Sequence, residues 1–381
     1  MTQLHGMSVP QFDAVRAGLQ KNLDSGEELG ASLVVDIDGD RVVDLWGGFQ
    51  DSARKVAWGE HTITNVWSAT KAVTSLAALM LVDRGVLDLD APVAEYWPEF
   101  AANGKQDVLV RHLLSHTSGV AGLDQPAVIE DLYDTRQASA RMAMQAPWWT
   151  PGTASGYHLL SYGHLIGELV HRITGRSLRE FVAEEIVAPL GADFQIGAAE
   201  RDWSRIADVV PPPPLPFDLA GAGGADSPAL KAWTGPVIAP DMANTAAWRS
   251  AEIGAANGHG NARSVARILS VLARGGEVDG VRLLGQKTID LIFDVQMEGA
   301  DLVIGLPLRW GIGYALAKKE TVSWIPDGRI CFWGGAGGSV IIMDLDRRMT
   351  ISYMMNKMAP DILGSERSAA YVAAVYDNLA G

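Results

Sequence analysis

The chain has 381 residues and a formal net charge of −14, which disfavours nucleic acid and anionic membrane surfaces as partners because both need a basic face. It contains a single cysteine, Cys331, so an intrachain disulfide and a cysteine-ligated zinc site are excluded. The first residues carry no secretory signal pattern, and the longest apolar run is too short to span a membrane, so we expect a cytoplasmic protein.

The first two thirds of the chain are expected to hold a helix, a hairpin and then several further helices. Residues 11–21 follow a proline that suits a first helical turn, and residues 31–45 form two strand-like runs around an Asp-Gly-Asp turn. Residues 209–245 contain four consecutive prolines and a glycine-rich run, and we expect a long loop over a site or between lobes. Apolar residues at helical spacing predict helices at residues 69–84, 161–174 and 262–274.

The C-terminal part returns to strands, and this alternation suggests the fold. Strands at both ends of the chain and helices in its middle indicate an α/β fold with a discontinuous layout. We expect residues 1–60 and 260–381 to build an antiparallel sheet flanked by helices, residues 61–259 to form a mainly helical domain, and the active site to lie at their interface. The predicted C-terminal elements are strands at residues 310–317, 329–333, 339–344 and 349–356, and a final helix at 365–379.

The segment Ser-Ala-Thr-Lys at residues 68–71 is the first candidate for chemistry. A serine at a helix start benefits from the positive end of the helix dipole, and its own N–H is free to donate a hydrogen bond. Lys71 lies one turn later on the same face, where a buried amine could accept a proton from the Ser68 hydroxyl. A capping serine with a surface lysine would give the same pattern. The helix that follows is apolar nearly all round, which favours a buried lysine.

Two further segments offer groups that could act with Ser68. Tyr157 follows a Pro-Gly turn in a loop before a helix, and a phenol near a lysine ammonium can serve as a general base, although a half-buried structural tyrosine would look the same. Residues 333–338 read Trp-Gly-Gly-Ala-Gly-Gly after a strand, so the backbone can approach a ligand closely. Free N–H groups there could complete an oxyanion hole with that of Ser68, although a tight turn also explains the glycines.

In this order, the three segments resemble the motifs of the serine β-lactamase and penicillin-binding-protein superfamily. Ser68 and Lys71 match its Ser-x-x-Lys motif, and Tyr157 stands in the tyrosine position of the Tyr-x-Asn motif of class C β-lactamases. The resemblance implies a β-lactamase/transpeptidase-like fold and extends over about residues 10–375. Further segments that resemble the superfamily are residues 88–93, 113–119, 151–153 and 257–260.

Two departures from the β-lactamase motifs point to the esterases of this superfamily. His158 and then a leucine follow Tyr157, so the asparagine of the second motif is missing. The lysine and threonine of the Lys-Thr-Gly motif would bind the carboxylate of a β-lactam. Trp333 and Gly334 stand in these positions here, so an apolar wall replaces the cation and the hydroxyl. The Trp-Gly-Gly version resembles the family VIII carboxylesterases.

The resemblance also implies roles for individual residues. Ser68 is the nucleophile, and Lys71 and Tyr157 share the work of the base, with the acylation base left open. The N–H groups of Ser68 and Ala336 bind the oxyanion. The implied reaction is hydrolysis of small or short-chain esters through an acyl-serine intermediate, with weak β-lactam hydrolysis as an activity that the resemblance allows. The implied substrate-binding residues are Trp333, Gly334, Gly335 and His158.

Other functions stay open at this point. A β-lactamase or a D-amino-acid amidase or peptidase would use the same three residues, and a catalytically inert penicillin-binding-like protein would keep them without turnover. A classical α/β-hydrolase is disfavoured because no serine has glycine both two residues before and two after it. We expect neither a metal nor a cofactor, because the His-Glu-x-x-His motif of zinc proteases is absent. Side chains with a spacing that would suit a metal do occur at His112 and His116, and at His164, Glu168 and His171. The expected partner is a small-molecule ester.

Overall fold

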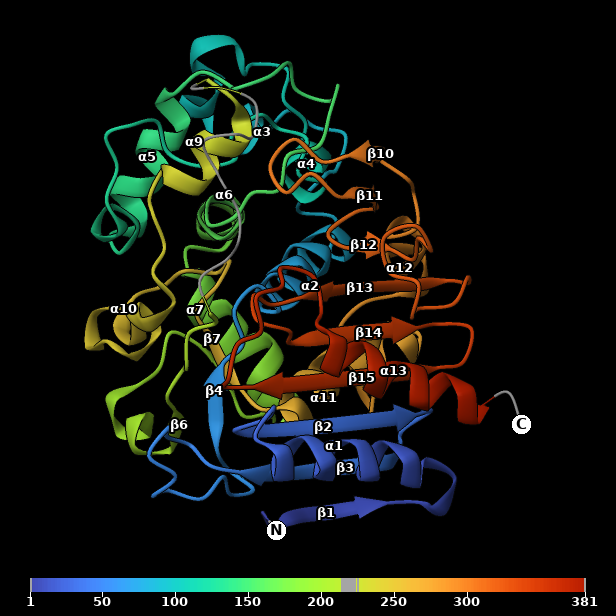
Figure 1. Ribbon diagram of the computed structural model, residues 1–381. Helices are drawn as coiled ribbons and strands as arrows, with labels where there is room; N and C mark the ends of the chain where they lie inside the picture. Colours follow the sequence, from blue (N-terminus) through green and yellow to red (C-terminus); the bar gives the residue numbers. More distant parts are fainter. Residues whose placement is uncertain (1, 214–223, 225, 380–381) are drawn as a thin grey trace.

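The computed structural model describes residues 2–213, 224 and 226–379, and its centre is a large antiparallel sheet (Figure 1). Nine strands of the described part of the chain lie in the order β1-β3-β2-β15-β14-β13-β12-β11-β10. Strands from the two ends of the chain therefore meet in the middle of the sheet, where β2 pairs with β15. The strands are β1 (Leu4–Ser8), β2 (Gly30–Ile37), β3 (Asp40–Gly48), β10 (Met297–Ala300), β11 (Pro307–Trp310), β12 (Ala315–Leu316), β13 (Ile330–Gly334), β14 (Val340–Asp344) and β15 (Met349–Met355).

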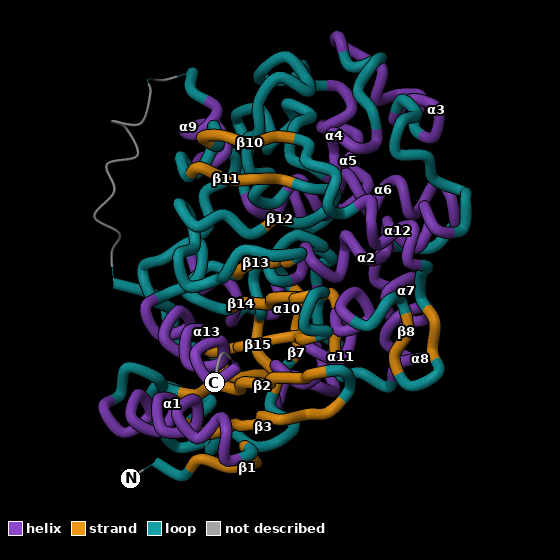
Figure 2. Tube along the Cα trace, turned by 90° about the vertical axis from the view of Figure 1, so that its right-hand side faces the viewer, coloured by secondary structure: helices purple, strands orange, loops and turns teal. Residues whose placement is uncertain are grey.

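Helices cover both faces of this sheet. Figures 1 and 2 show α1 (Asp13–Ser25) beside α13 (Glu366–Leu379) on one face, and α11 (Ala262–Ala273) on the other. Every residue of β14 and β15 is buried, because side chains on both faces of these central strands pack against helices. The arrangement is the α/β class that the sequence predicted.

Helix α2 (Thr70–Asp83) lies between the large sheet and the helical part of the chain, and its residues from Thr70 to Leu81 are all buried. This helix packs against α6 (Ser161–Thr174), and the apolar sequence of α2 suits contact on every side. The remaining α-helices of the described residues are α3 (Val93–Tyr96), α4 (Val110–Leu114), α5 (Thr135–Met144), α7 (Leu178–Val182), α8 (Ala188–Leu190), α9 (Pro228–Thr234), α10 (Ala246–Ser250) and α12 (Gln286–Leu291).

A small sheet that the sequence did not indicate lies at the edge of the helical part. Its order is β5-β7-β4-β6, and none of its strands exceeds three residues, which is too short for an alternating pattern to show. This sheet fixes the segment that leads into α2. Its strands are β4 (Ile63–Asn65), β5 (Phe194–Ile196), β6 (Ile206–Ala207) and β7 (Gly258–Gly260), and β8 (Glu277–Val278) with β9 (Val281–Arg282) forms a separate hairpin.

Some predicted boundaries were wrong. Residues 310–317 form two strands, β11 and β12, because the chain turns at Gly313, which has φ of 80°. A Cβ at this position would lie 2.8 Å from the Cβ of Ser75. Strand β10 was not predicted. Residues 209–245 are not a continuous loop, since the Ser227 side chain caps α9 within them; residues 214–223 and 225 of this segment lie outside the described part.

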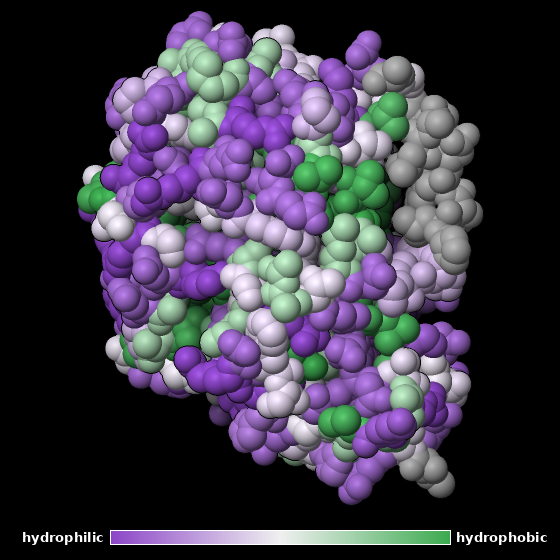
Figure 3. Space-filling model, turned by 90° about the vertical axis from the view of Figure 1, so that its left-hand side faces the viewer, coloured by the Kyte–Doolittle hydropathy of each residue, from purple (hydrophilic) through white to green (hydrophobic). Residues whose placement is uncertain are grey.

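The surface is mainly polar on the face that Figure 3 shows, with apolar side chains in small separate groups. Within the described residues, no helix combines the length and the hydrophobicity needed to cross a lipid bilayer.

Candidate active site

Ser68 lies in the turn that joins β4 to α2, two residues before the helix begins. The turn is fixed because Val66 N donates to Gly258 O at 2.8 Å, and Lys71 N donates to Ser68 O at 3.0 Å. Trp67 adopts φ of 50°, an uncommon conformation for an aromatic residue and a form of strain that occurs at functional sites. Ser68 is partly exposed, whereas its neighbours are buried. The turn therefore presents this serine to a ligand.

The Lys71 side chain is buried beside Ser68. Its Nζ lies 3.1 Å from Ser68 Oγ, 2.7 Å from Leu159 O and 2.9 Å from Ala255 O. No carboxylate pairs with Lys71 among the described residues, and burial holds the pKa of its amine well below the usual range. A neutral amine has two N–H donors for the two carbonyl oxygens and one lone pair left to accept the Ser68 hydroxyl.

Tyr157 closes the other side of the serine. Its hydroxyl is close enough to the Ser68 side chain for the serine to lower the pKa of the phenol, and its ring centroid lies 4.6 Å from Lys71 Nζ. Trp333 Nε1 donates a hydrogen bond to the Tyr157 hydroxyl at 2.9 Å. Burial is the main reason why the pKa of Tyr157 is raised above its usual value, so the side chain is a phenol at neutral pH.

The glycine-rich segment after β13 packs directly on the serine turn. A Cβ at Gly335 would lie 2.4 Å from Val66 O and 3.1 Å from the Cβ of Trp67, so only glycine fits this contact. Ala336, the next residue, is partly exposed like Ser68. In the hydrogen bonds of the described residues, the N–H groups of Ser68 and Ala336 donate to no protein acceptor. Both amides are therefore available to an oxyanion.

The structure gives His158 and Trp333 surroundings that the sequence did not suggest. His158 is fully buried, and its ring nitrogens contact Ser118 Oγ and Gly156 O, each at 2.7 Å. Burial lowers the pKa of His158 to about 4, so its ring is neutral. These contacts leave neither ring nitrogen for a substrate and do not support the predicted role of His158 in substrate binding. Trp333, predicted as an apolar wall, instead directs its N–H to Tyr157.

His116 is a member of the site that sequence reasoning considered only as a metal ligand. Its Nδ1 accepts the main-chain N–H of His158 at 3.2 Å, and its ring centroid lies 5.1 Å from that of Tyr157 and 4.3 Å from that of Trp310. Burial holds the pKa of His116 well below its usual value. The backbone of His116 has φ of 61°. No local sequence signal marks the contacts of the His116 ring, because its partners come from distant segments.

The described residues contain no cluster of three or more histidine, cysteine, aspartate or glutamate side chains placed to hold a metal ion. His164, for example, contacts main-chain oxygens through both ring nitrogens, at 3.3 Å to Leu160 O and 2.9 Å to Leu132 O.

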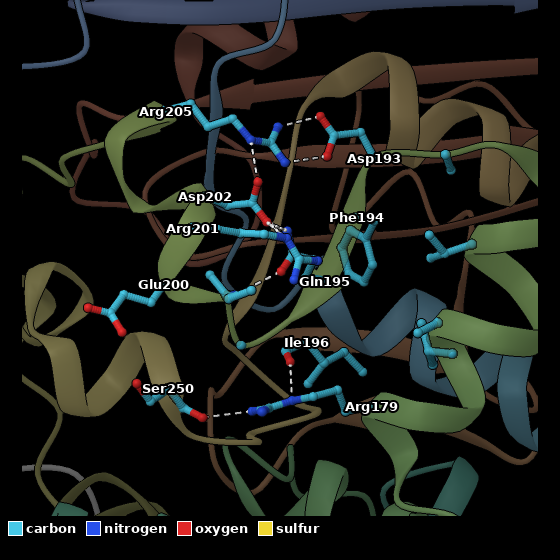
Figure 4. Close-up of a pocket in the computed structure, with 17 residues that line it drawn as sticks. Arg179, Asp193, Phe194, Gln195, Ile196, Glu200, Arg201, Asp202, Arg205 and Ser250 are labelled. Atoms are coloured by element: carbon cyan, nitrogen blue, oxygen red, sulfur yellow. Dashed lines mark hydrogen bonds and ion pairs between the residues drawn. The ribbon is translucent and has the colours of Figure 1, made fainter.

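A cavity of about 660 Å³ lies elsewhere, around β5 (Figure 4). Its charged side chains pair largely among themselves and with the backbone: Arg205 binds Asp193 and Asp202, and Arg179 binds the main-chain oxygens of Ile196 and Ser250. None of the residues Ser68, Lys71 and Tyr157 lines this cavity. We therefore do not assign the active site to it, despite its size.

Comparisons with known proteins agree with this geometry. A model of the beta-lactamase family matches residues 15–375. The chain is 33% identical to the esterase/beta-lactamase LipL of Mycobacterium tuberculosis over 82% of this chain and 74% of LipL. It is 31% identical to esterase EstB of Burkholderia gladioli over 43% of this chain and 45% of EstB.

Solved structures give the same result. A family VIII carboxylesterase matches with a TM-score of 0.91 and 36% identity, covering 99% of this chain and 100% of the other. A penicillin-binding protein homolog from Caulobacter crescentus matches with a TM-score of 0.90 and 36% identity, with the same coverage.

Proposed function

The chain belongs to the beta-lactamase family and is a serine hydrolase of the carboxylic ester class, and from this premise we propose that it hydrolyses small or short-chain esters through an acyl intermediate on Ser68. The observation that carries the proposal is the buried Lys71 amine, held by two carbonyl oxygens and directed at the Ser68 hydroxyl. A neutral amine in this place accepts the serine proton as the oxygen attacks the ester carbonyl.

Tyr157 is proposed to protonate the leaving alkoxide and then to recover a proton from the Lys71 ammonium, so that the serine proton ends on the alcohol. Indole N–H is a donor only, so the Tyr157 oxygen accepts from Trp333, and its own proton is available to the alkoxide that leaves the acyl carbon beside Ser68. The raised pKa keeps Tyr157 protonated for this step. Water then enters where the alcohol has left, and the same pair activates it to release the acid.

The oxyanion of each tetrahedral intermediate is proposed to lie between the N–H groups of Ser68 and Ala336. Two backbone donors fixed before the reaction stabilise the negative charge without reorganisation. The contact of Gly335 with Val66 and Trp67 supports this placement, because it holds Ala336 against the serine turn.

Ester hydrolysis is favoured over β-lactam hydrolysis by the side chains after β13. Trp333 supplies no cation for a carboxylate, and its N–H is already bonded to Tyr157. The relatives agree: one solved structure is titled a family VIII carboxylesterase, and EstB is named an esterase. The name of LipL, esterase/beta-lactamase, supports weak β-lactam hydrolysis as a second activity.

The test is an assay of the wild type and Ser68→Ala with a short-chain p-nitrophenyl ester, a chromogenic cephalosporin and a D-alanyl amide. We expect turnover of the ester above all, and its loss in Ser68→Ala. The matched control is Ser52→Ala, which removes an exposed serine hydroxyl. Wild-type-like turnover in Ser68→Ala would refute the nucleophile, and failure of a fluorophosphonate to label the wild type would support an inert binding protein.

A further inference from the structure

A carboxylate that no sequence motif marks lies directly behind the tyrosine of the site. Asp301 follows β10 and is only 2% exposed. Its Oδ1 accepts the main-chain N–H of Tyr157 at 2.9 Å, although the two residues are 144 positions apart in the sequence. The side chain of Asp301 therefore holds the backbone that carries the phenol.

The same oxygen also closes the turn in which Asp301 lies. Oδ1 accepts the N–H groups of Val303 at 2.9 Å and Ile304 at 3.1 Å, as an aspartate does when it caps a turn. Capping needs only such local partners. The Tyr157 N–H is an additional donor from a different segment, so Asp301 joins the two segments at one atom.

A single oxygen of Asp301 thus accepts three N–H groups, those of Tyr157, Val303 and Ile304. The other oxygen, Oδ2, is buried and has no hydrogen-bond partner among the described residues, an arrangement that is unfavourable for stability. The stability of the turn alone therefore does not explain why an aspartate occupies position 301.

Two further contacts fix the turn relative to its neighbours. Leu302 N donates to Ser155 O at 2.8 Å, which adds a second bond between the turn and the tyrosine loop. Trp233, near the end of α9, donates its indole N–H to Val303 O at 3.2 Å. The turn is thus held between the tyrosine loop and α9.

We propose that Asp301 is a positioning residue for the hydrolytic reaction, which fixes the Tyr157 backbone so that the hydroxyl stays within reach of Ser68 and Trp333. The proposal rests on the function proposed above for Tyr157. A small displacement of a reacting group is sufficient to slow an enzyme about 100-fold, and Asp301 prevents such a displacement without touching the substrate.

The test is a double-mutant cycle between position 301 and the Tyr157 hydroxyl, read as kcat and KM on a short-chain ester. We expect Asp301→Ala to lower kcat about 10- to 100-fold with KM nearly unchanged, and Asp301→Asn, which keeps an acceptor oxygen, to restore most of kcat. In the Tyr157→Phe background, Asp301→Ala should lower kcat less than about 2-fold, because no hydroxyl is left to misplace.

The controls separate this role from stability and from the proposed function. Asp294→Ala removes an exposed aspartate of the same region and should leave kcat unchanged. If Asp301→Ala does not fold, Asp301→Leu, which has a similar branched shape but no acceptor oxygen, replaces it with the same expectations. An equal loss of kcat in both backgrounds, or a change in KM alone, would overturn the positioning role. Wild-type kcat in Tyr157→Phe alone would instead refute the role proposed for the phenol.

Discussion

At the scale of single residues, the protonation state of Lys71 determines the pH dependence. The proposed acylation needs the neutral amine, and burial holds the pKa of Lys71 well below the usual range. We therefore expect kcat/KM to rise with pH and to reach its plateau below the ordinary lysine pKa of about 10.4. Lys71→Met should lower kcat/KM by about 100- to 10,000-fold.

The measurement is kcat/KM on a short-chain p-nitrophenyl ester across neutral and alkaline pH, with the spontaneous rate subtracted. Lys55→Met, which changes an exposed lysine, is the matched control and should keep the wild-type profile. A rise centred at the ordinary lysine pKa would contradict the assignment of Lys71 as the base.

The Trp333 indole N–H makes a second prediction at this scale. Trp333→Phe keeps a ring in place but removes the donor to Tyr157. One neutral hydrogen bond is worth about 0.5–1.5 kcal/mol, so kcat should fall by about 2- to 10-fold. Steady-state kinetics on the same ester, with circular dichroism to verify the fold, measures the effect. An unchanged kcat would show that Trp333 acts only as an apolar wall.

At the scale of elements, the contact between the glycine-rich segment and the serine turn determines the geometry of the oxyanion site. Gly335→Ala would place a Cβ 2.4 Å from Val66 O, a backbone atom that cannot rotate away. The segment must then move from Ser68, and we expect kcat/KM to fall about 100-fold or more.

Gly59→Ala is the control for this change, since its Cβ would meet nothing closer than Thr62 Oγ1 at 3.9 Å. Labelling of Ser68 by a fluorophosphonate should slow in Gly335→Ala and not in Gly59→Ala. Equal labelling rates in the two variants would argue against this contact as the support of the oxyanion site.

At the scale of the whole molecule, a buried ion pair joins the two ends of the chain. Glu28, just before β2, accepts from Arg367 of α13 at 2.7 Å, and its other oxygen accepts from the hydroxyls of Tyr353 and Tyr371. Burial raises the pKa of Glu28, although Arg367 partly opposes this shift. Arg367→Met leaves the Glu28 charge unpaired and should lower the free energy of unfolding by about 3–5 kcal/mol.

The pH dependence of this loss has a definite sign. Glu28 in the variant has a folded pKa above its unfolded value, so its protonated form is favoured in the folded state, and the stability that it contributes is lost as pH rises through the folded pKa. The variant should therefore approach the wild type in Tm as pH falls toward acid. Glu28→Gln combined with Arg367→Met should recover part of the loss at neutral pH. A difference in Tm that does not change with pH would contradict the unpaired charge.

Local sequence patterns indicated most of the longer elements, and the motifs indicated the candidate reacting groups. The hairpin at 31–45, the buried helix after Ser68 and the α/β class follow from local periodicity and turn residues, which act over a few positions. The superfamily motifs indicated Ser68, Lys71 and Tyr157 as the reacting residues, and the structure brings these three side chains together. Their catalytic roles stay proposals.

The way in which these groups are held became visible in the folded chain. The hydrogen bonds of Tyr157 to Asp301 and Trp333, and the packing of His116 on Trp310, join segments more than a hundred residues apart, and no spacing rule reaches that far. The strands of the small sheet are too short to show a period. Local chemistry therefore names the reacting side chains, whereas their protonation and their positions depend on burial and on contacts that exist only after folding.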